Sequence, residues 1–130
     1  MPKYLVQLIG DEDFVADATP EQMEKVVADM DKFNDELQDA GVLVDGNGLG
    51  PSASAKTLRY GEDGKAVVTD GPFTESKEQV AGYWIFETKN IDEAVEWVQK
   101  APMGGGAVEI RQIVETAEEN VDLYKEAKDK

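Results

Sequence analysis

One segment of the chain, residues 70–87, holds the side chain best placed to do chemistry. Asp70 stands directly before Gly71 and Pro72. Glycine tolerates backbone angles closed to other residues, and proline restricts both itself and the residue before it, so these two residues fix the path of a tight turn. The turn presents the Asp70 carboxylate in a defined direction, which makes Asp70 the candidate catalytic acid or base. The alternative is that this carboxylate accepts hydrogen bonds from the backbone of its own turn.

Two further candidates follow the turn. Lys77 lies on a polar loop between Glu75 and Glu78, where its ammonium group can bind an anionic ligand. A loop face that is simply solvated is the alternative. Tyr83 lies on the apolar strand that comes next and is a candidate ligand contact. We expect it to lie on the opposite strand face from Trp84, because successive side chains alternate.

Arg111 is the fourth candidate, and it is one of two arginines in the chain. Alternation along its predicted strand places it opposite the face that packs against helices. A guanidinium in such a position can hold a carboxylate ligand with two hydrogen bonds, or it can pair with Glu109 or Asp70. We favour the internal pair, because Glu109 lies two residues away on the same strand face.

The residue content excludes several kinds of chemistry. The chain has neither histidine nor cysteine, which removes the commonest general base, thiolate nucleophiles, disulfides and the usual zinc ligands. Its formal net charge of −15 repels nucleic acids and anionic lipids, although the acidity also serves solubility. We expect a cytoplasmic protein with no cofactor, no metal site, no direct nucleic-acid contact and no membrane contact.

Periodic patterns predict the elements that hold these residues. Thr19 begins a capping box, and a helix follows whose apolar face comprises Met23, Val26, Val27, Met30, Phe33 and Leu37. A second helix begins after Asn90. Residues 11–17 read as an acidic loop. Strands are predicted at residues 4–9, 42–45, 56–60, 65–69, 80–86 and 107–114, the third and fourth forming a hairpin.

This order predicts one α+β domain over residues 1–130, with residues 116–130 as a C-terminal helical extension that packs loosely. Strand, helix, strand, hairpin, strand, helix, strand is a ferredoxin-like split βαβ unit with an inserted β-hairpin. Two helices cover only one face of such a sheet. The other face would leave large apolar side chains in water, so we expect the sheet of a second copy to cover it in a homodimer.

The segment after the hairpin resembles the DGPF-type branch of the YCII-related family. The resemblance covers the chain from the first strand to Val114. Its most specific part is one motif: Asp70, Gly71, Pro72, Phe73, Glu75, Lys77, Glu78 and Gly82. It implies a ferredoxin-like fold that dimerises sheet to sheet as a dimeric α/β-barrel, with a cleft between subunits. Some members resemble lyases that use a histidine and aspartate pair, and this chain has no histidine. Other members are linked to sigma factors, which implies regulation of transcription.

The sequence leaves two classes of function open. We favour a domain that binds a small molecule or a protein partner in a regulatory role. The alternative is a small-molecule lyase or hydrolase that uses Asp70 as acid or base in the intersubunit cleft. Whether the chain is an enzyme at all is not decided by the residues.

Overall fold

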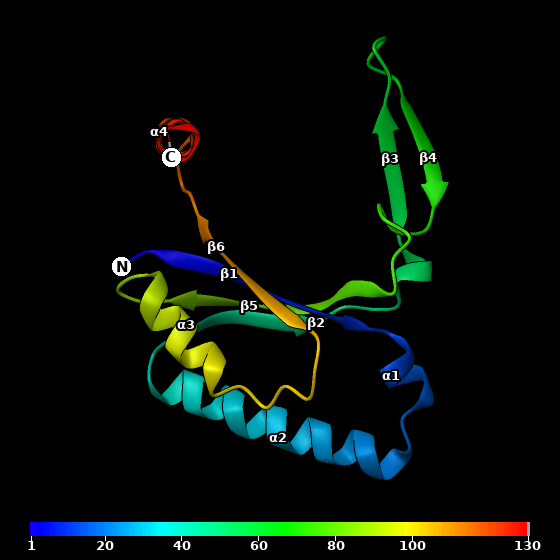
Figure 1. Cartoon of the computed structure of the whole chain (residues 1–130), viewed down its shortest axis with the longest axis vertical. Coiled ribbons are helices and arrows are strands. Elements are labelled where there is room, and N and C mark those ends of the chain that lie inside the picture. The colour runs from blue at the N-terminus through cyan, green and yellow to red at the C-terminus, as the bar shows by residue number, and fades with distance from the viewer. Residues whose placement is uncertain (130) are drawn as a thin grey trace.

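The computed structural model describes residues 1–129 and has an α+β architecture (Figure 1). A short 3₁₀ turn, Ser52–Ser54, leads into the hairpin. The helices are α1 (Asp13–Asp17), α2 (Pro20–Asp39), α3 (Ile91–Gln99) and α4 (Ala117–Lys128). The strands are β1 (Lys3–Asp11), β2 (Leu43–Gly48), β3 (Lys56–Tyr60), β4 (Ala66–Asp70), β5 (Glu78–Glu87) and β6 (Ala107–Ile113).

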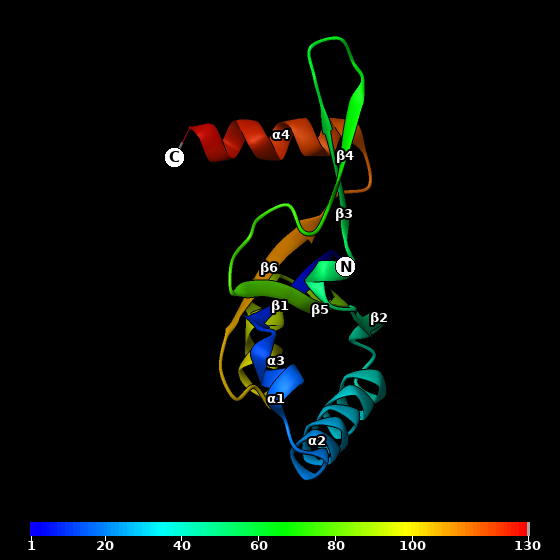
Figure 2. The ribbon, with the colours of Figure 1, turned by 90° about the vertical axis from the view of Figure 1, so that its right-hand side faces the viewer.

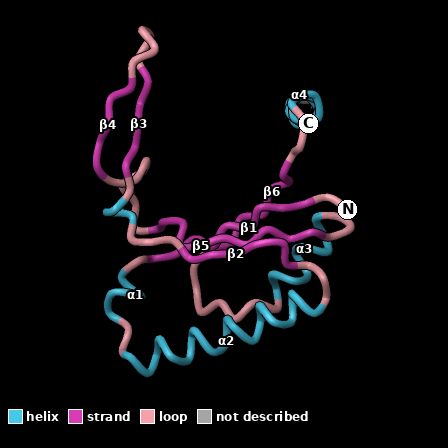
Figure 3. Tube along the Cα trace, turned by 180° about the vertical axis from the view of Figure 1, so that it is seen from behind, coloured by secondary structure: helices cyan, strands magenta, loops and turns pink. Residues whose placement is uncertain are grey.

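Four strands form one antiparallel sheet in the order β2-β5-β1-β6, and β3 and β4 pair separately as a two-stranded ribbon. Helices α2 and α3 lie on the same side of the four-stranded sheet (Figures 1 and 3). The arrangement is compatible with the predicted ferredoxin-like fold with an inserted hairpin. Among residues 1–129, no helical layer covers the other side of the sheet.

The core lies between the sheet and the helices. Trp84 and Phe86 alternate into it from β5, as the pattern predicted, and meet Phe33 of α2. The rings of Phe33 and Trp84 meet edge to face at 5.4 Å, and those of Trp84 and Phe86 stack at 5.7 Å. The Trp84 indole N–H donates to Asn34 Oδ1 at 2.9 Å, so this large side chain is buried without an orphaned donor.

Helix α2 begins as predicted, but part of its expected apolar face is exposed. Thr19 accepts from the Gln22 amide, and the Gln22 side chain accepts in return from the Thr19 amide, which completes the capping box. Phe33 is buried, but the expected core positions Val26 and Val27 are exposed. The apolar side of α2 is therefore buried toward its C-terminal end and exposed nearer its N-terminal end.

One expectation about local structure was wrong. Residues 11–17 are not simply a loop, because α1 forms there, and the Asp13 amide donates to Asp11 Oδ1 at its start. At the other end, Thr116 caps α4 through the Glu119 amide. Val121 and Tyr124 of α4 are 50% and 65% exposed, as expected of a helix that packs loosely.

The β3–β4 ribbon and α4 both extend from the side of the sheet that α2 and α3 leave open. They stand at opposite ends of the sheet in Figure 1, and Figure 2 shows both on the far side of the sheet from α2. None of the helices in residues 1–129 combines the length and the apolar character that a membrane crossing would need.

Candidate functional site

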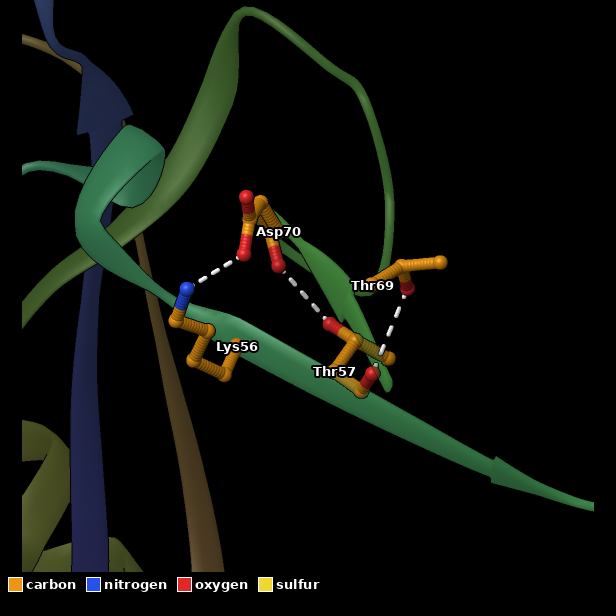
Figure 4. A network of polar contacts seen from close by, with 5 residues as sticks. Lys56, Thr57, Thr69 and Asp70 are labelled. Atoms are coloured by element: carbon orange, nitrogen blue, oxygen red, sulfur yellow. Dashed lines mark hydrogen bonds and ion pairs between the residues drawn. The ribbon is translucent and has the colours of Figure 1, made fainter. Parts of the chain in front are cut away.

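The predicted tight turn sits at the base of the β3–β4 ribbon (Figure 4). Gly71 has φ of +105°, a backbone conformation that side chains disfavour, which explains glycine at this position. Its amide donates to the Ala55 carbonyl at 2.7 Å, and its carbonyl accepts from the Thr57 hydroxyl at 2.8 Å. Both bonds join the turn to the start of β3.

Asp70 contacts the Lys56 ammonium group, its direct partner in the strand register (Figure 4). The carboxylate thus has a partner other than the backbone of its own turn. The two side chains are 81% and 64% exposed, so the pair contributes little to stability. The nearby Thr69 hydroxyl donates to the Thr57 carbonyl and strengthens the same strand pair. Lys56 was not predicted as a site residue, although the hairpin register places it opposite Asp70.

Two other side chains that sequence reasoning missed shape the loop after the turn. The Gln79 side-chain amide donates to the Thr74 and Ser76 carbonyls at 2.7 and 2.9 Å. Arg59 donates to the Phe73 carbonyl at 3.1 Å, and its guanidinium lies 5.2 Å from the Phe73 ring centroid. The loop is therefore held by side chains on both sides of it, from β3 and from β5.

This loop forms one wall of an open hollow of about 570 Å³. The 3₁₀ turn also lines this hollow, and its Ser52 amide donates to the Glu12 carboxylate at 3.1 Å. Asp70 and Lys77 both line the hollow, so the structure brings these two predicted site residues together. The complete lining is Ser52, Ala53, Asp70, Gly71, Pro72, Glu75, Ser76, Lys77 and Gln79.

Tyr83 lies elsewhere, on the open face of the sheet. Its hydroxyl donates to Asp45 Oδ2 at 3.1 Å and accepts from the side-chain amide of Asn47 at 3.3 Å. Both partners belong to β2, the edge strand next to β5. The phenol is thus held in place by a neighbouring strand, with half-exposed Ile85 on the same face.

Arg111 lies on the same open face but two strands away. Its Nε is 3.6 Å from Glu109 Oε1, and the side chains are 66% and 49% exposed. The favoured internal pair is therefore present, while Asp70 pairs with another residue. Strand β1 separates Arg111 from Tyr83, so the four predicted site residues fall into two groups.

Two motif residues have local structural roles. A Cβ on Gly82 would come within 3.0 Å of the Asn47 carbonyl oxygen, so β2 can approach β5 closely only because this residue is glycine. Glu78 lies directly opposite Asp11 in the strand register, and like charges so placed oppose pairing.

A second hollow, of about 490 Å³, contains none of the predicted site residues. It lies along α3, where the Lys100 ammonium group stands 4.8 Å from the Trp97 ring centroid. Its lining is Lys89, Asn90, Asp92, Glu93, Glu96, Trp97 and Lys100.

Tyr4, in the core on β1, has an altered acidity. Burial raises the pKa of its hydroxyl, and the carboxylate of Asp92 raises it further. The side chain is 5% exposed and lies on the helix-covered face, away from both groups of candidate residues. This change in pKa therefore bears on stability and not on the candidate site.

Comparison with known proteins agrees with the predicted family. The family model described as the YCII-related domain matches residues 3–117, from the start of β1 to the start of α4. An uncharacterised protein of Rhizobium meliloti (strain 1021) is 31% identical over 113 residues, which cover 85% of this chain and 90% of that protein. The chain therefore belongs to the YCII-related family.

Proposed function

We propose that this chain is a regulatory binding domain that takes a small anionic molecule in the hollow beside Asp70. The observation that carries the proposal is the position of Lys77 in that hollow. None of the ion pairs among residues 1–129 involves this ammonium group, so it is free to meet a ligand. Ser76 and Gln79 add hydroxyl and amide groups to the same lining.

We further propose that the domain acts as a homodimer whose two sheets face each other. Leu5, Tyr83, Ile85 and Ile113 are only half-buried on the open face, and no described element covers them. A second copy would bury these side chains together with the Arg111–Glu109 pair. Sedimentation at micromolar concentration should give twice the chain mass of 14.2 kDa, and a stable monomer would contradict this arrangement.

Two other functions rest on narrower support. Asp70 also lines the hollow, which supports the alternative of a small-molecule lyase or hydrolase that uses Asp70 as acid or base. The resemblance of the motif to the DGPF-type branch supports a protein partner linked to sigma factors. The binding proposal is preferred because the Asp70 carboxylate already has Lys56 as its partner.

A panel of small aromatic and muconate-like carboxylic acids tests the binding proposal. We expect at least one acid to raise the melting temperature of the protein without being turned over. Lys77→Gln should abolish that increase, because it removes the free ammonium group from the hollow. Lys65→Gln is the matched control, since Lys65 lies beside the hairpin turn and outside the hollow.

Two outcomes would count against the proposal. If no acid binds, or if Lys77→Gln and Lys65→Gln bind equally well, the hollow is not the site. If an acid is turned over and Asp70→Asn abolishes turnover while the circular dichroism spectrum is unchanged, the enzyme alternative replaces it.

A further inference from the structure

Two elements stand apart from the rest of the molecule: the arm, which we define as residues 56–70 (β3, its turn and β4), and helix α4 (Figures 1 and 2). Within residues 1–129, neither packs extensively against any other helix or strand. A lone two-stranded hairpin is marginally stable in water, and so is a lone helix of twelve residues. Both elements therefore lack a surface to pack on.

The arm has one apolar face. In its register Leu58 lies opposite Val68, and Tyr60 lies opposite Ala66, so all four side chains share a face. Tyr60 is 71% exposed, and Leu58 and Val68 are also exposed. This row of side chains continues along the ribbon from the pair formed by Lys56 and Asp70.

Helix α4 has a matching stripe. Ala117, Val121 and Tyr124 follow one another at spacings of four and three residues, which places them on the same side of the helix. All three are exposed. The stripe and the apolar face of the arm are each a few side chains long, and each is apolar along its centre.

The arm and α4 lie at opposite ends of the sheet and extend to the same side of it (Figures 1 and 3). They are therefore too far apart to meet within one chain. A twofold axis can run perpendicular to the plane of Figure 1, on the open side of the sheet. Rotating a second copy by 180° about this axis exchanges the positions of the two ends of its sheet. It brings the arm of a second copy to α4 and the second copy's α4 to the arm.

We propose that the arm of each subunit packs its apolar face against the α4 stripe of the other subunit. The contact forms twice, once at each end of the facing sheets, as twofold symmetry requires. The proposal rests on the sheet-to-sheet homodimer proposed above and adds the residues that hold its two ends together.

Charge favours the arm as the partner of α4. Helix α4 carries four acidic and two basic residues, so most surfaces of a chain with a net charge of −15 repel it. The arm has three basic and three acidic residues, so its formal charge is zero. It therefore repels the acidic helix less than most other surfaces of the chain do.

Disulfide cross-linking tests the contact directly, because the chain has no cysteine of its own. We expect a chain carrying both Tyr60→Cys and Tyr124→Cys to form a covalent dimer under mild oxidation. Each single variant should remain uncross-linked. A chain carrying Tyr60→Cys and Glu126→Cys is the matched control, since residue 126 lies on the side of α4 opposite the stripe.

Sedimentation separates failure of this contact from failure of the dimer. A dimer whose double variant does not cross-link, or cross-links no better than the Glu126 control, would overturn the arm–α4 contact and leave the dimer intact. A disulfide within one chain would also overturn it. If sedimentation shows a monomer, both the arm–α4 contact and the sheet-to-sheet dimer are contradicted.

Affinity gives a second test that requires no oxidation. Tyr124→Ser should raise the dissociation constant of the dimer at least tenfold, while Glu126→Ser should change it less than threefold. Equal effects of the two changes would mean that the stripe is not buried in the dimer.

Discussion

The two faces of the four-stranded sheet differ in how far a single chain completes them. On the helix-covered face, Val6 and Phe86 are fully buried, and Trp84 has both ring partners and a hydrogen bond. On the open face, Ile85 and Tyr83 from the same strand stay partly exposed, beside an ion pair between Arg111 and Glu109. Adjacent residues of β5 therefore belong to surfaces of different kinds.

This difference separates what folds the chain from what the chain does. The covered face supplies the packed core that one copy needs in order to fold. The open face carries polar and apolar side chains together, which is typical of surfaces that meet a partner. The hollow beside Asp70 also lies outside the core. The residues of the candidate site can therefore serve a function without weakening the packing of the core.

The largest expected effect is a loss in the free energy of unfolding at Phe86, which is compared with the loss at its neighbour on β5, Ile85. Phe86→Ala should lower the free energy of unfolding by about 3–5 kcal/mol, because it leaves a cavity among fully buried side chains. Ile85→Ala should cost about 1 kcal/mol in a dilute sample, because less apolar area is lost from a half-exposed position. Urea denaturation at low protein concentration measures both. Equal losses would show that the two faces do not differ as the structure indicates.

A smaller effect is expected from the ion pair of the open face. Arg111→Met should change the free energy of unfolding of a dilute sample by about 1 kcal/mol or less, because both partners are exposed. The double change with Glu109→Gln should recover part of that loss, as paired residues do in a mutant cycle. If the second copy covers the pair, the coupling should grow as protein concentration rises. A coupling that is large at every concentration would instead place the pair in the core of one chain.

The smallest expected effect concerns Tyr4 on the helix-covered face, and it changes the free energy of unfolding only at alkaline pH. The pKa of Tyr4 is higher in the folded chain than in the unfolded chain, where its ordinary value is about 10. The contribution of Tyr4 to stability is therefore fully present below pH 10 and is lost as pH rises through the folded pKa. Tyr4→Phe should make the free energy of unfolding fall less steeply above pH 10. Identical alkaline profiles for the two proteins would contradict this origin of the pH dependence.

Features that depend on neighbouring residues could be predicted from the sequence. The capping box at Thr19 and the alternation of Trp84 and Phe86 are set within a few residues, and both were confirmed. The exposure of Val26 and Val27 could not be predicted, because it depends on how closely the folded helix approaches the rest of the chain at those positions.

The candidate site shows the same limit. Glycine at position 71 predicted backbone angles that are closed to other residues, and its positive φ confirms this prediction. The contacts that hold the loop come from Arg59 and Gln79, which lie on different strands, so only the folded arrangement shows that they meet the same loop. The four predicted site residues stay predictions. Asp70 and Lys77 line the hollow, and Tyr83 and Arg111 lie on the open face of the sheet.

The central position of β1 has a consequence for synthesis on the ribosome. This strand is made first, yet its partners are β5 and β6, so Val6 must wait for Trp84 on one side and Ile110 on the other. Contacts so distant in sequence form slowly, and an unpaired strand edge is prone to pair with other chains. The nascent chain therefore carries an apolar strand with an open edge until β6 (Ala107–Ile113) has been translated, and that interval is when a chaperone would protect it most.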